Sequence, residues 1–396
     1  MKSKIIFLFI FGLDALNLIY QTSELSISYR ETQILYGEIT LLQFLTQSSL
    51  SFFGQNDFAL RLPMILAHLL SVLLMFNISK FYLKDERNRL WLILIFILLP
   101  GVLSSAIIID EAGMIIFSLL LFTWLYLHKH VKSYYLLLVI FSMIESSYIY
   151  LFIGLIFYSL HEKNKNFFIF NIVLLFLSII IYGVDAHGIP KGHFLDVLAL
   201  YAAIFSPLVF IYIVFVLYRK YLDEQREIIW FISTTALIVS LVLSFRQNIK
   251  IEQFAPYLIL ALPIVAKSFS HSYRVRLKQF RKIYKLTFLI SLILLSINTL
   301  AVLLNKNLYL FLENPRKHFV YKYHVAKELA EELKHNKVNC LRTNHPMQKR
   351  LYFYGVTKCD KFILSDKLYD SDKSNNVTIS YINIPIYSAY VTKINK

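Results

Sequence analysis

The sequence has few of the residues that break secondary structure and lacks two short motifs that are typical of metal sites. Its 396 residues include 10 glycines, 9 prolines and 2 cysteines. No Cys-x-x-Cys pair and no His-Glu-x-x-His motif occurs, so the sequence contains no metal signature of either kind. Glycine and proline are scarce while Ile, Leu and Phe dominate, which favours helices over the alternating strands of a membrane barrel.

Charge is missing from long parts of the chain as well. Charged residues make up 17% of the sequence and hydrophobic residues 57%, and the mean hydropathy is +0.56. Several stretches of roughly twenty residues carry almost no charge. The core of a soluble domain does not require such stretches, whereas a helix that crosses a bilayer does. We therefore predict an all-α polytopic membrane bundle.

Hydropathy predicts about eleven transmembrane helices. Residues 90–127 are divided because one helix of this length would measure about 57 Å, nearly twice the thickness of the hydrocarbon core. Asp110 and Glu111 are predicted to form the turn between the two halves, and Glu145 with the two serines after it divides residues 134–160 in the same way. The predicted spans are residues 4–20, 60–79, 90–109, 112–127, 134–145, 147–160, 167–183, 195–218, 228–245, 254–269 and 286–304.

Lysine and arginine fall mostly in alternate loops. About twenty lie on the side of the amino terminus, whereas only five lie on the other side before residue 305. The positive-inside rule then predicts a protein of the cytoplasmic (inner) membrane, with a cytoplasmic amino terminus and with residues 305–396 in the periplasm. The net charge of +16 follows from this topology and from contact with anionic membrane lipids, and it requires no nucleic-acid partner.

Two domains are predicted, a transmembrane part at residues 1–304 with an external loop at 21–59, and a soluble α/β domain at 305–396. The second contains an amphipathic helix at 321–336, two short strands that flank a short helix, and a late strand pair. Cys340 lies near the end of the first strand and Cys359 just before the next. If these strands are neighbours, a disulfide would close a loop of about twenty residues and contribute about 3 kcal/mol. Two buried thiols are the alternative.

The external loop begins with a predicted helix that lies along the membrane surface. Five Ile and Leu residues between positions 34 and 45 share one face of this helix, and Glu31 and Glu38 project onto the same face. An acid on an apolar face needs a partner or a water-filled cavity, so both acids are predicted to point inward. Alternatively, the helix starts after Arg30, and Glu31 is a hydrated loop residue or caps the helix amino terminus.

The remaining external charges complete a candidate binding surface. Asp110 and Glu111 lie in the second external loop, before the cations of the later external loops. Alternatively, these two acids are present only because a short turn between spans needs polar residues. Cations in later external loops would suit a substrate with a phosphate and a group to be deprotonated. The candidate catalytic residues are Glu31 and Asp110, and the candidate substrate-binding residues are Arg30, Glu38, Arg61, Glu111, Lys191, His193, Arg246 and Lys250.

Three phrases resemble the GT-C superfamily of membrane glycosyltransferases, specifically its protein O-mannosyltransferase and aminoarabinose transferase type. They are "FFGQNDFALRLPMILAHLLSVLLMF" (52–76), "LLPGVLSSAIIIDEAGMIIFSLLLF" (98–122) and "FAPYLILALPIVA" (254–266). The resemblance is strongest from Phe53 to Pro63. It implies transfer of a sugar from a polyprenyl-phosphate donor to an acceptor at the outer face of the membrane, with the carboxy-terminal α/β domain outside.

The resemblance also implies roles for single residues. Glu31 would be the first-loop acid, as a general base or as a group that holds the acceptor, and Asp110 would be the second-loop acid. Arg61 would orient the first loop, and Arg246 or Lys250 would contact the donor phosphate. The family usually has an Asp-Glu pair where this chain has Arg30 and Glu31, and an arginine there would weaken the acid as a base while improving it as an anchor.

Two other functions compete with the transferase. A non-catalytic relative would bind lipid-linked sugar or scaffold an envelope assembly, and the missing first-loop Asp supports it. A transporter would show broken helices at matching places in two halves, and the sequence has no internal repeat of this kind. The sugar, the acceptor and any divalent metal cofactor stay undefined by the sequence.

Overall fold

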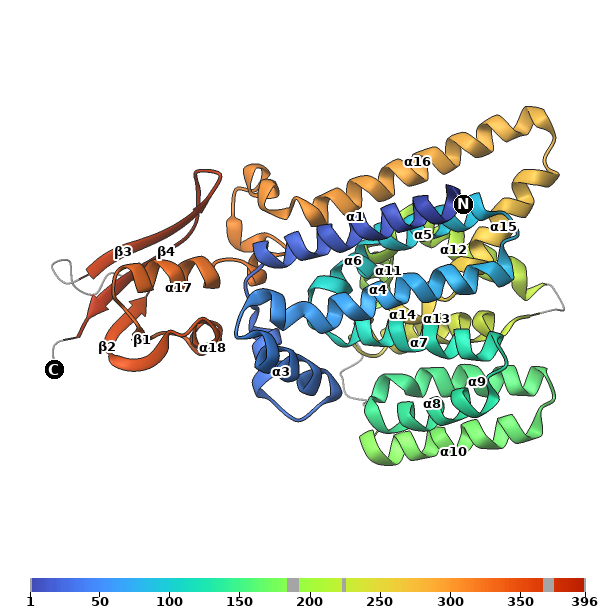
Figure 1. The fold of residues 1–396 in the computed structure, drawn as a ribbon, viewed down its shortest axis with the longest axis horizontal. Coiled ribbons are helices and arrows are strands. Elements are labelled where there is room, and N and C mark those ends of the chain that lie inside the picture. The colour runs from blue at the N-terminus through green and yellow to red at the C-terminus, as the bar shows by residue number, and fades with distance from the viewer. Residues whose placement is uncertain (1, 184–191, 223–225, 366–373, 395–396) are drawn as a thin grey trace. The chain divides into compact units, whose positions relative to one another are not determined.

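The computed structural model describes residues 2–183, 192–222, 226–365 and 374–394 (Figure 1). These residues form two compact units. The first comprises Met1–Ala15, Met64–Ala106 and Asp110–Thr299, and the second comprises Leu16–Pro63, Ile107–Ile109 and Leu300–Lys396. The contacts thus group the external loop with the carboxy-terminal domain, whereas the sequence assigned that loop to the transmembrane part. The boundary at residues 304 and 305 stays a prediction.

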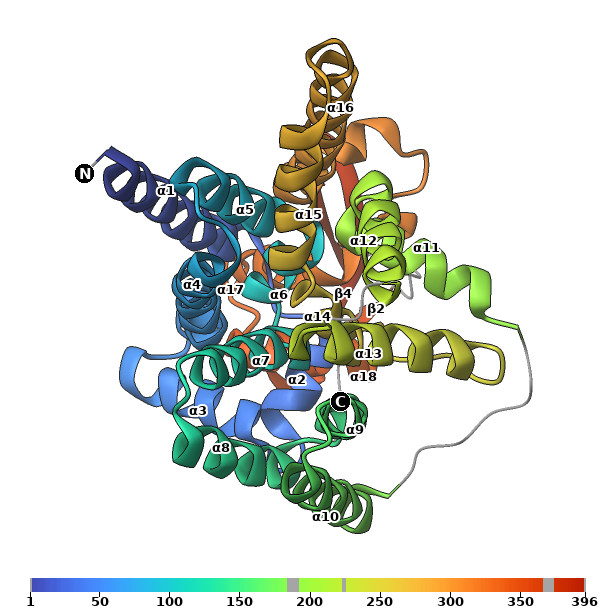
Figure 2. The same cartoon turned by 90° about the vertical axis from the view of Figure 1, so that its right-hand side faces the viewer.

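The first unit is built from apolar helices. Figures 1 and 2 show α8, α9 and α10 side by side, and α13 packs against α9. Its core consists of aliphatic and aromatic side chains, most of them Leu, Ile, Phe and Val. The α-helices that begin in this unit or run into it are α1 (Lys2–Glu24), α4 (Asp57–Tyr82), α5 (Glu86–Leu98), α6 (Pro100–Ile107), α7 (Glu111–Leu127), α8 (Val131–Ile144), α9 (Ile149–His161), α10 (Lys165–Tyr182), α11 (Phe194–Phe205), α12 (Pro207–Tyr221), α13 (Ile228–Ser244), α14 (Ala255–Ile259), α15 (Leu262–Val275) and α16 (Lys278–Leu303).

Four helices within the described ranges are long and apolar enough to cross a membrane, at Ser3–Glu24, Asp57–Tyr82, Lys165–Tyr182 and Lys278–Leu303. Two bent pairs add up to two more spans, α5 with α6 at 60° and α11 with α12 at 106°. Each bend precedes a proline, Pro100 or Pro207, because proline disfavours helical geometry in the residue before it. Every predicted span coincides with one helix or with two consecutive helices.

The second unit contains the external loop and the α/β domain. Its helices are α2 (Tyr29–Tyr36), α3 (Leu41–Phe53), α17 (Ala326–His335) and α18 (His345–Phe353), and the 3-10 helices η3 (Asn305–Phe311), η4 (Pro315–Lys317) and η5 (Tyr321–Tyr323) lead into α17. The strands β1 (Cys340–Arg342), β2 (Thr357–Ser365), β3 (Ser374–Tyr381) and β4 (Ile384–Lys393) form one sheet in the order β1-β2-β4-β3. The predicted fold class, a helical membrane bundle with a small carboxy-terminal α/β domain, is confirmed.

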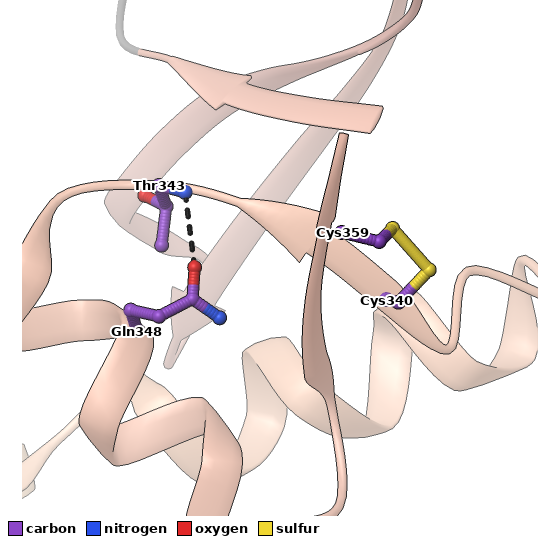
Figure 3. Close-up of a disulfide and its surroundings, with 4 residues drawn as sticks. All are labelled: Cys340, Thr343, Gln348 and Cys359. Atoms are coloured by element: carbon purple, nitrogen blue, oxygen red, sulfur yellow. Dashed lines mark hydrogen bonds between the residues drawn. A yellow bond between two sulfur atoms is a disulfide. The ribbon is translucent and has the colours of Figure 1, made fainter. Parts of the chain in front are cut away.

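A disulfide joins the two strands that flank α18. β1 and β2 are parallel neighbours, and Cys340 pairs with Cys359 at a Cα–Cα distance of 5.4 Å (Figure 3). The backbone N–H of Thr343 donates to Oε1 of Gln348 (3.2 Å), which ties the end of β1 to α18. The covalent loop therefore encloses the whole of α18.

The prediction of one continuous surface helix in the external loop was wrong. The chain forms two helices, and the side chain of Thr40 caps the second by accepting from the N–H of Gln43. A threonine cap competes with continuation of the preceding helix. The break places Glu31 in α2 with 1% exposure and leaves Glu38 exposed between the helices. The two acids therefore do not share one apolar face, because Glu38 lies outside both helices.

Candidate functional site

Glu31 occupies the third position of α2 and forms a capping box. The N–H of Ser28 donates to Oε2 of Glu31 (2.7 Å), and the N–H of Glu31 donates to Oγ of Ser28 (3.2 Å). This reciprocal arrangement satisfies two backbone donors at the helix start. The capping role, which the sequence left open as an alternative, is present in the structure.

The other carboxylate oxygen of Glu31 binds a distant part of the second unit. Oε1 accepts from the backbone N–H of Ile109 (3.2 Å), the residue directly before Asp110 in the chain. Oε2 also lies 3.5 Å from Nη2 of Arg61. Both oxygens thus have partners while the side chain is fully enclosed, which is the geometry of an acid that organises its surroundings.

Arg61 lies at the centre of these contacts and has 0% exposure. Its guanidinium donates to the carbonyl oxygens of Leu25 (3.3 Å) and Ser26 (3.1 Å) in the external loop. It also lies 3.5 Å from Oδ1 of Asp57, one helical turn earlier in α4. These are the contacts of a side chain that fixes the first loop, and a buried guanidinium requires such compensation.

Asp57 connects Arg61 to the carboxy-terminal domain. The hydroxyl of Tyr354 donates to Oδ1 of Asp57 (2.6 Å), and Nζ of Lys327 lies 3.2 Å from Oδ2. The same Tyr354 hydroxyl accepts from the N–H of Ile27 (2.9 Å). Burial and the neighbouring Asp57 carboxylate raise the pKa of Tyr354, so the phenol stays protonated and keeps both bonds.

Arg350, in α18, reaches the same loop from the carboxy-terminal side. Nε donates to the carbonyl of Ile27 (2.7 Å), and Nη2 donates to Oγ of Ser26 (3.2 Å) and to the carbonyl of His324 (2.6 Å). Burial lowers the pKa of Arg350, but a guanidinium remains charged at physiological pH. We call Glu31, Asp57, Arg61 and Arg350 the ionic cluster, and all four side chains are buried.

The sequence did not single out Asp57, Tyr354 or Arg350. Asp57 was visible within the strongest phrase of the resemblance, as a polar residue four positions before Arg61. Arg350 joins the ionic cluster, and Tyr354 contacts it, only through the fold, since about 300 residues separate both side chains from the segment that they bind.

A second set of acids belongs to the first unit. Asp110 is the N-cap of α7 and accepts from the N–H of Ala112 (3.0 Å). Oε2 of Glu111 accepts from Nε2 of Gln253 (3.1 Å), which lies in the 3-10 helix η2 (Ile251–Gln253). Both acids are partly exposed. Unlike Glu31, they combine structural contacts with access for a ligand.

Glu145 adds a carboxylate that the sequence treated only as part of a turn. It is the N-cap of the 3-10 helix η1 (Ser146–Tyr148) and is partly buried. Burial, and next the charge of Glu111, raise the pKa of Glu145, while Ser146 and Lys250 act in the opposite direction. A raised pKa makes a carboxylate a better proton acceptor near neutral pH. In the sequence, Glu145 is the one acid between two apolar stretches, and this position could have identified it as a candidate site residue.

The other candidates are more exposed. Arg30, Arg246 and Lys250 are exposed, and Nδ1 of His193 lies 3.4 Å from Oδ2 of Asp196 at the start of α11. Lys191 lies outside the described residues. Across the described ranges, no three His, Cys, Asp or Glu side chains converge as metal ligands.

The comparisons with known proteins concern the fold. No family model matches the sequence, and no curated protein matches it. A solved structure does match, the apo crystal structure of ArnT from Cupriavidus metallidurans, with a TM-score of 0.57 and 11% identity over 98% of each chain. A likeness along the full length of both chains shows that this chain has a fold like that of ArnT.

Proposed function

We propose that the protein, whose fold is like that of ArnT, transfers a sugar from a polyprenyl-phosphate donor to an acceptor at the outer face of the cytoplasmic membrane. The observation that carries the proposal is the full-length likeness to ArnT, because both the helical bundle and the small α/β domain are covered. The three sequence phrases that resemble the family lie on helices of this bundle: the first on α4, the second on α6 and α7, and the third on α14 and α15.

The chemistry follows from the donor. A nucleophilic oxygen or nitrogen of the acceptor attacks the anomeric carbon, and the bond from that carbon to the phosphate oxygen breaks. The carrier phosphate leaves with the electron pair, and a carboxylate takes the proton of the acceptor. Arg246 and Lys250, both exposed, are the proposed cations for the leaving phosphate.

We assign the two sets of acids different tasks. Asp110, with Glu111 and Glu145 as neighbours in the same unit, is the proposed acceptor-activating carboxylate, because these three side chains are partly exposed. Glu31 is proposed to hold the external loop in place, since its carboxylate already accepts from the N–H groups of Ser28 and Ile109 and pairs with Arg61. A general base must instead contact the group that it deprotonates.

The test is transfer of labelled sugar from polyprenyl-phosphate donors in membranes that carry equal amounts of each protein. Asp110→Asn should lower transfer by about a hundredfold or more, as expected for loss of a general base. Glu31→Gln should lower it as well, because the amide nitrogen cannot accept from Ile109 or pair with Arg61. Glu313→Gln, which changes an exposed acid elsewhere in the second unit, is the matched control.

A non-catalytic relative is the second candidate. The observation in its favour is the first-loop acid, which is paired and enclosed instead of open to an acceptor. This candidate predicts that the wild-type protein binds the lipid-linked donor but consumes none of it across a broad panel of donors and acceptors. Turnover by wild type that is lost in Asp110→Asn would exclude it.

A further inference from the structure

A short extended segment, Leu25–Ser28, joins α1 to α2 and is held mostly by side chains of the second unit. All four residues are at most 2% exposed. α2 satisfies the carbonyl of Ser28, which accepts from the N–H of Thr32 (3.0 Å), whereas the carbonyls of Leu25, Ser26 and Ile27 are bound by side chains from elsewhere in the chain. A buried backbone group without a partner costs about 1–3 kcal/mol. The partners of this segment therefore determine where α2 begins.

Those partners come from both ends of the chain. Arg61 binds the carbonyls of Leu25 and Ser26, and Arg350 binds the carbonyl of Ile27. The N–H of Ser26 donates to the carbonyl of Tyr323 (2.8 Å), and the N–H of Ile27 donates to the Tyr354 hydroxyl. The carboxy-terminal domain thus supplies three of the groups that fix this segment.

Arg350 is the least expected of these partners. Its guanidinium is buried, yet its hydrogen bonds go to two carbonyls and one hydroxyl. Burying a cation is costly, and a domain that only covered the loop would not need one there. The planar fork of arginine can hold Ile27, Ser26 and His324 at once, which a lysine ammonium does less well.

We propose that Arg350 and Tyr354 are positioning residues for the transfer reaction. Both residues fix the segment Leu25–Ser28, and the N–H of Ser28 donates to the carboxylate of Glu31. The same carboxylate accepts from the N–H of Ile109, and Ile109 directly precedes Asp110 in the chain. The carboxy-terminal domain then contributes to turnover, because its side chains position the segment that leads to Glu31. This proposal rests on the proposed function for its effect on turnover.

The first test separates turnover from donor binding. Tyr354→Phe keeps the ring but leaves the N–H of Ile27 and one oxygen of Asp57 without this hydroxyl. We expect kcat to fall about tenfold or more, with the KM for the donor changed less than about twofold. Arg350→Lys should behave like Arg350→Gln, because charge alone does not restore the fork. Tyr352→Phe removes an exposed hydroxyl from the same helix and should leave kcat unchanged.

The second test does not depend on activity. Amide hydrogen exchange of peptides that cover residues 25–32 and 105–112 should become about tenfold faster in Tyr354→Phe, and should be unchanged in Tyr352→Phe. Unchanged exchange and unchanged kcat in Tyr354→Phe would overturn the positioning proposal while the transferase stands. Faster exchange with no turnover by any variant or by wild type would instead overturn the proposed function and leave the structural link intact.

Discussion

His324 is a buried imidazole that the folded protein keeps neutral. Its Nδ1 bonds to the Tyr309 hydroxyl (2.8 Å), and the side chain is fully buried. Burial, and then the charge of Lys306, lower the pKa of His324 to about 3 from an ordinary value of 6.5. Between these values an unfolded chain binds a proton at this position and the folded protein does not, so stability falls as the pH falls below about 6.5.

The measurement is thermal or denaturant unfolding in detergent between pH 4.5 and 7.5. The free energy of unfolding should fall by up to about 1.4 kcal/mol per pH unit through this group. His324→Gln cannot titrate, so its stability should depend less on pH, whereas His335→Asn, an exposed change on α17, should follow wild type. Equal pH dependence in all three proteins would contradict the assignment.

Gly113 provides a residue-scale prediction about helix packing within the first unit. A Cβ atom at this position of α7 would lie 2.6 Å from the carbonyl oxygen of Ser105 in α6. Gly113→Ala should therefore lower the free energy of unfolding by about 1–3 kcal/mol, because one helix must shift. Gly12→Ala is the matched control, since a Cβ there meets nothing within 4 Å, and it should be neutral or stabilising. Equal effects of the two changes would show that the close approach is not required.

At the scale of single elements, the disulfide closes a covalent loop around α18. It closes a loop with a sequence separation of 19 that contains the helix carrying Arg350. Replacing both cysteines by serine should lower the stability of the carboxy-terminal domain by about 3 kcal/mol. The comparison is unfolding with and without reductant. Reductant should destabilise wild type to the level of the double variant and leave the double variant unchanged; a reduced wild type as stable as the oxidised one would contradict this role.

Elements that depend on local pattern were predictable, and elements that depend on long-range contacts were not. Hydropathy located the apolar helices, because crossing a bilayer requires length and apolar character. About eleven spans were predicted, whereas four described helices, or up to six spans with the two bent pairs, are long and apolar enough to cross. Hydropathy missed the break between α2 and α3, where the Thr40 cap outweighs the apolar period. Arg61 was identified through the resemblance, but its partners in the loop required the fold, as did the whole contribution of Arg350.

At the scale of the whole molecule, the second unit joins parts of the chain that are far apart in sequence. It combines the external loop, three residues before Asp110 and the carboxy-terminal domain. The ionic cluster draws its members from each side of this unit, Glu31, Asp57 and Arg61 from the amino-terminal part and Arg350 from the carboxy-terminal part. Such long-range closure means that the loop and the domain should lose their order together.

The distribution of basic residues gives the final prediction, the orientation of the chain in the membrane. About twenty Lys and Arg residues fall in the loops that the predicted topology places on one side, and the positive-inside rule predicts that this side remains in the cytoplasm. Alkaline phosphatase fused after residue 396 or inserted at residue 55 should be active, since this reporter enzyme folds only after export to the periplasm. A fluorescent protein inserted at residue 163 should fluoresce, since that loop belongs to the basic side. Active phosphatase at residue 163 and inactive phosphatase at residue 396 would invert the topology and would place the ionic cluster on the cytoplasmic face, where it could not serve transfer at the outer face.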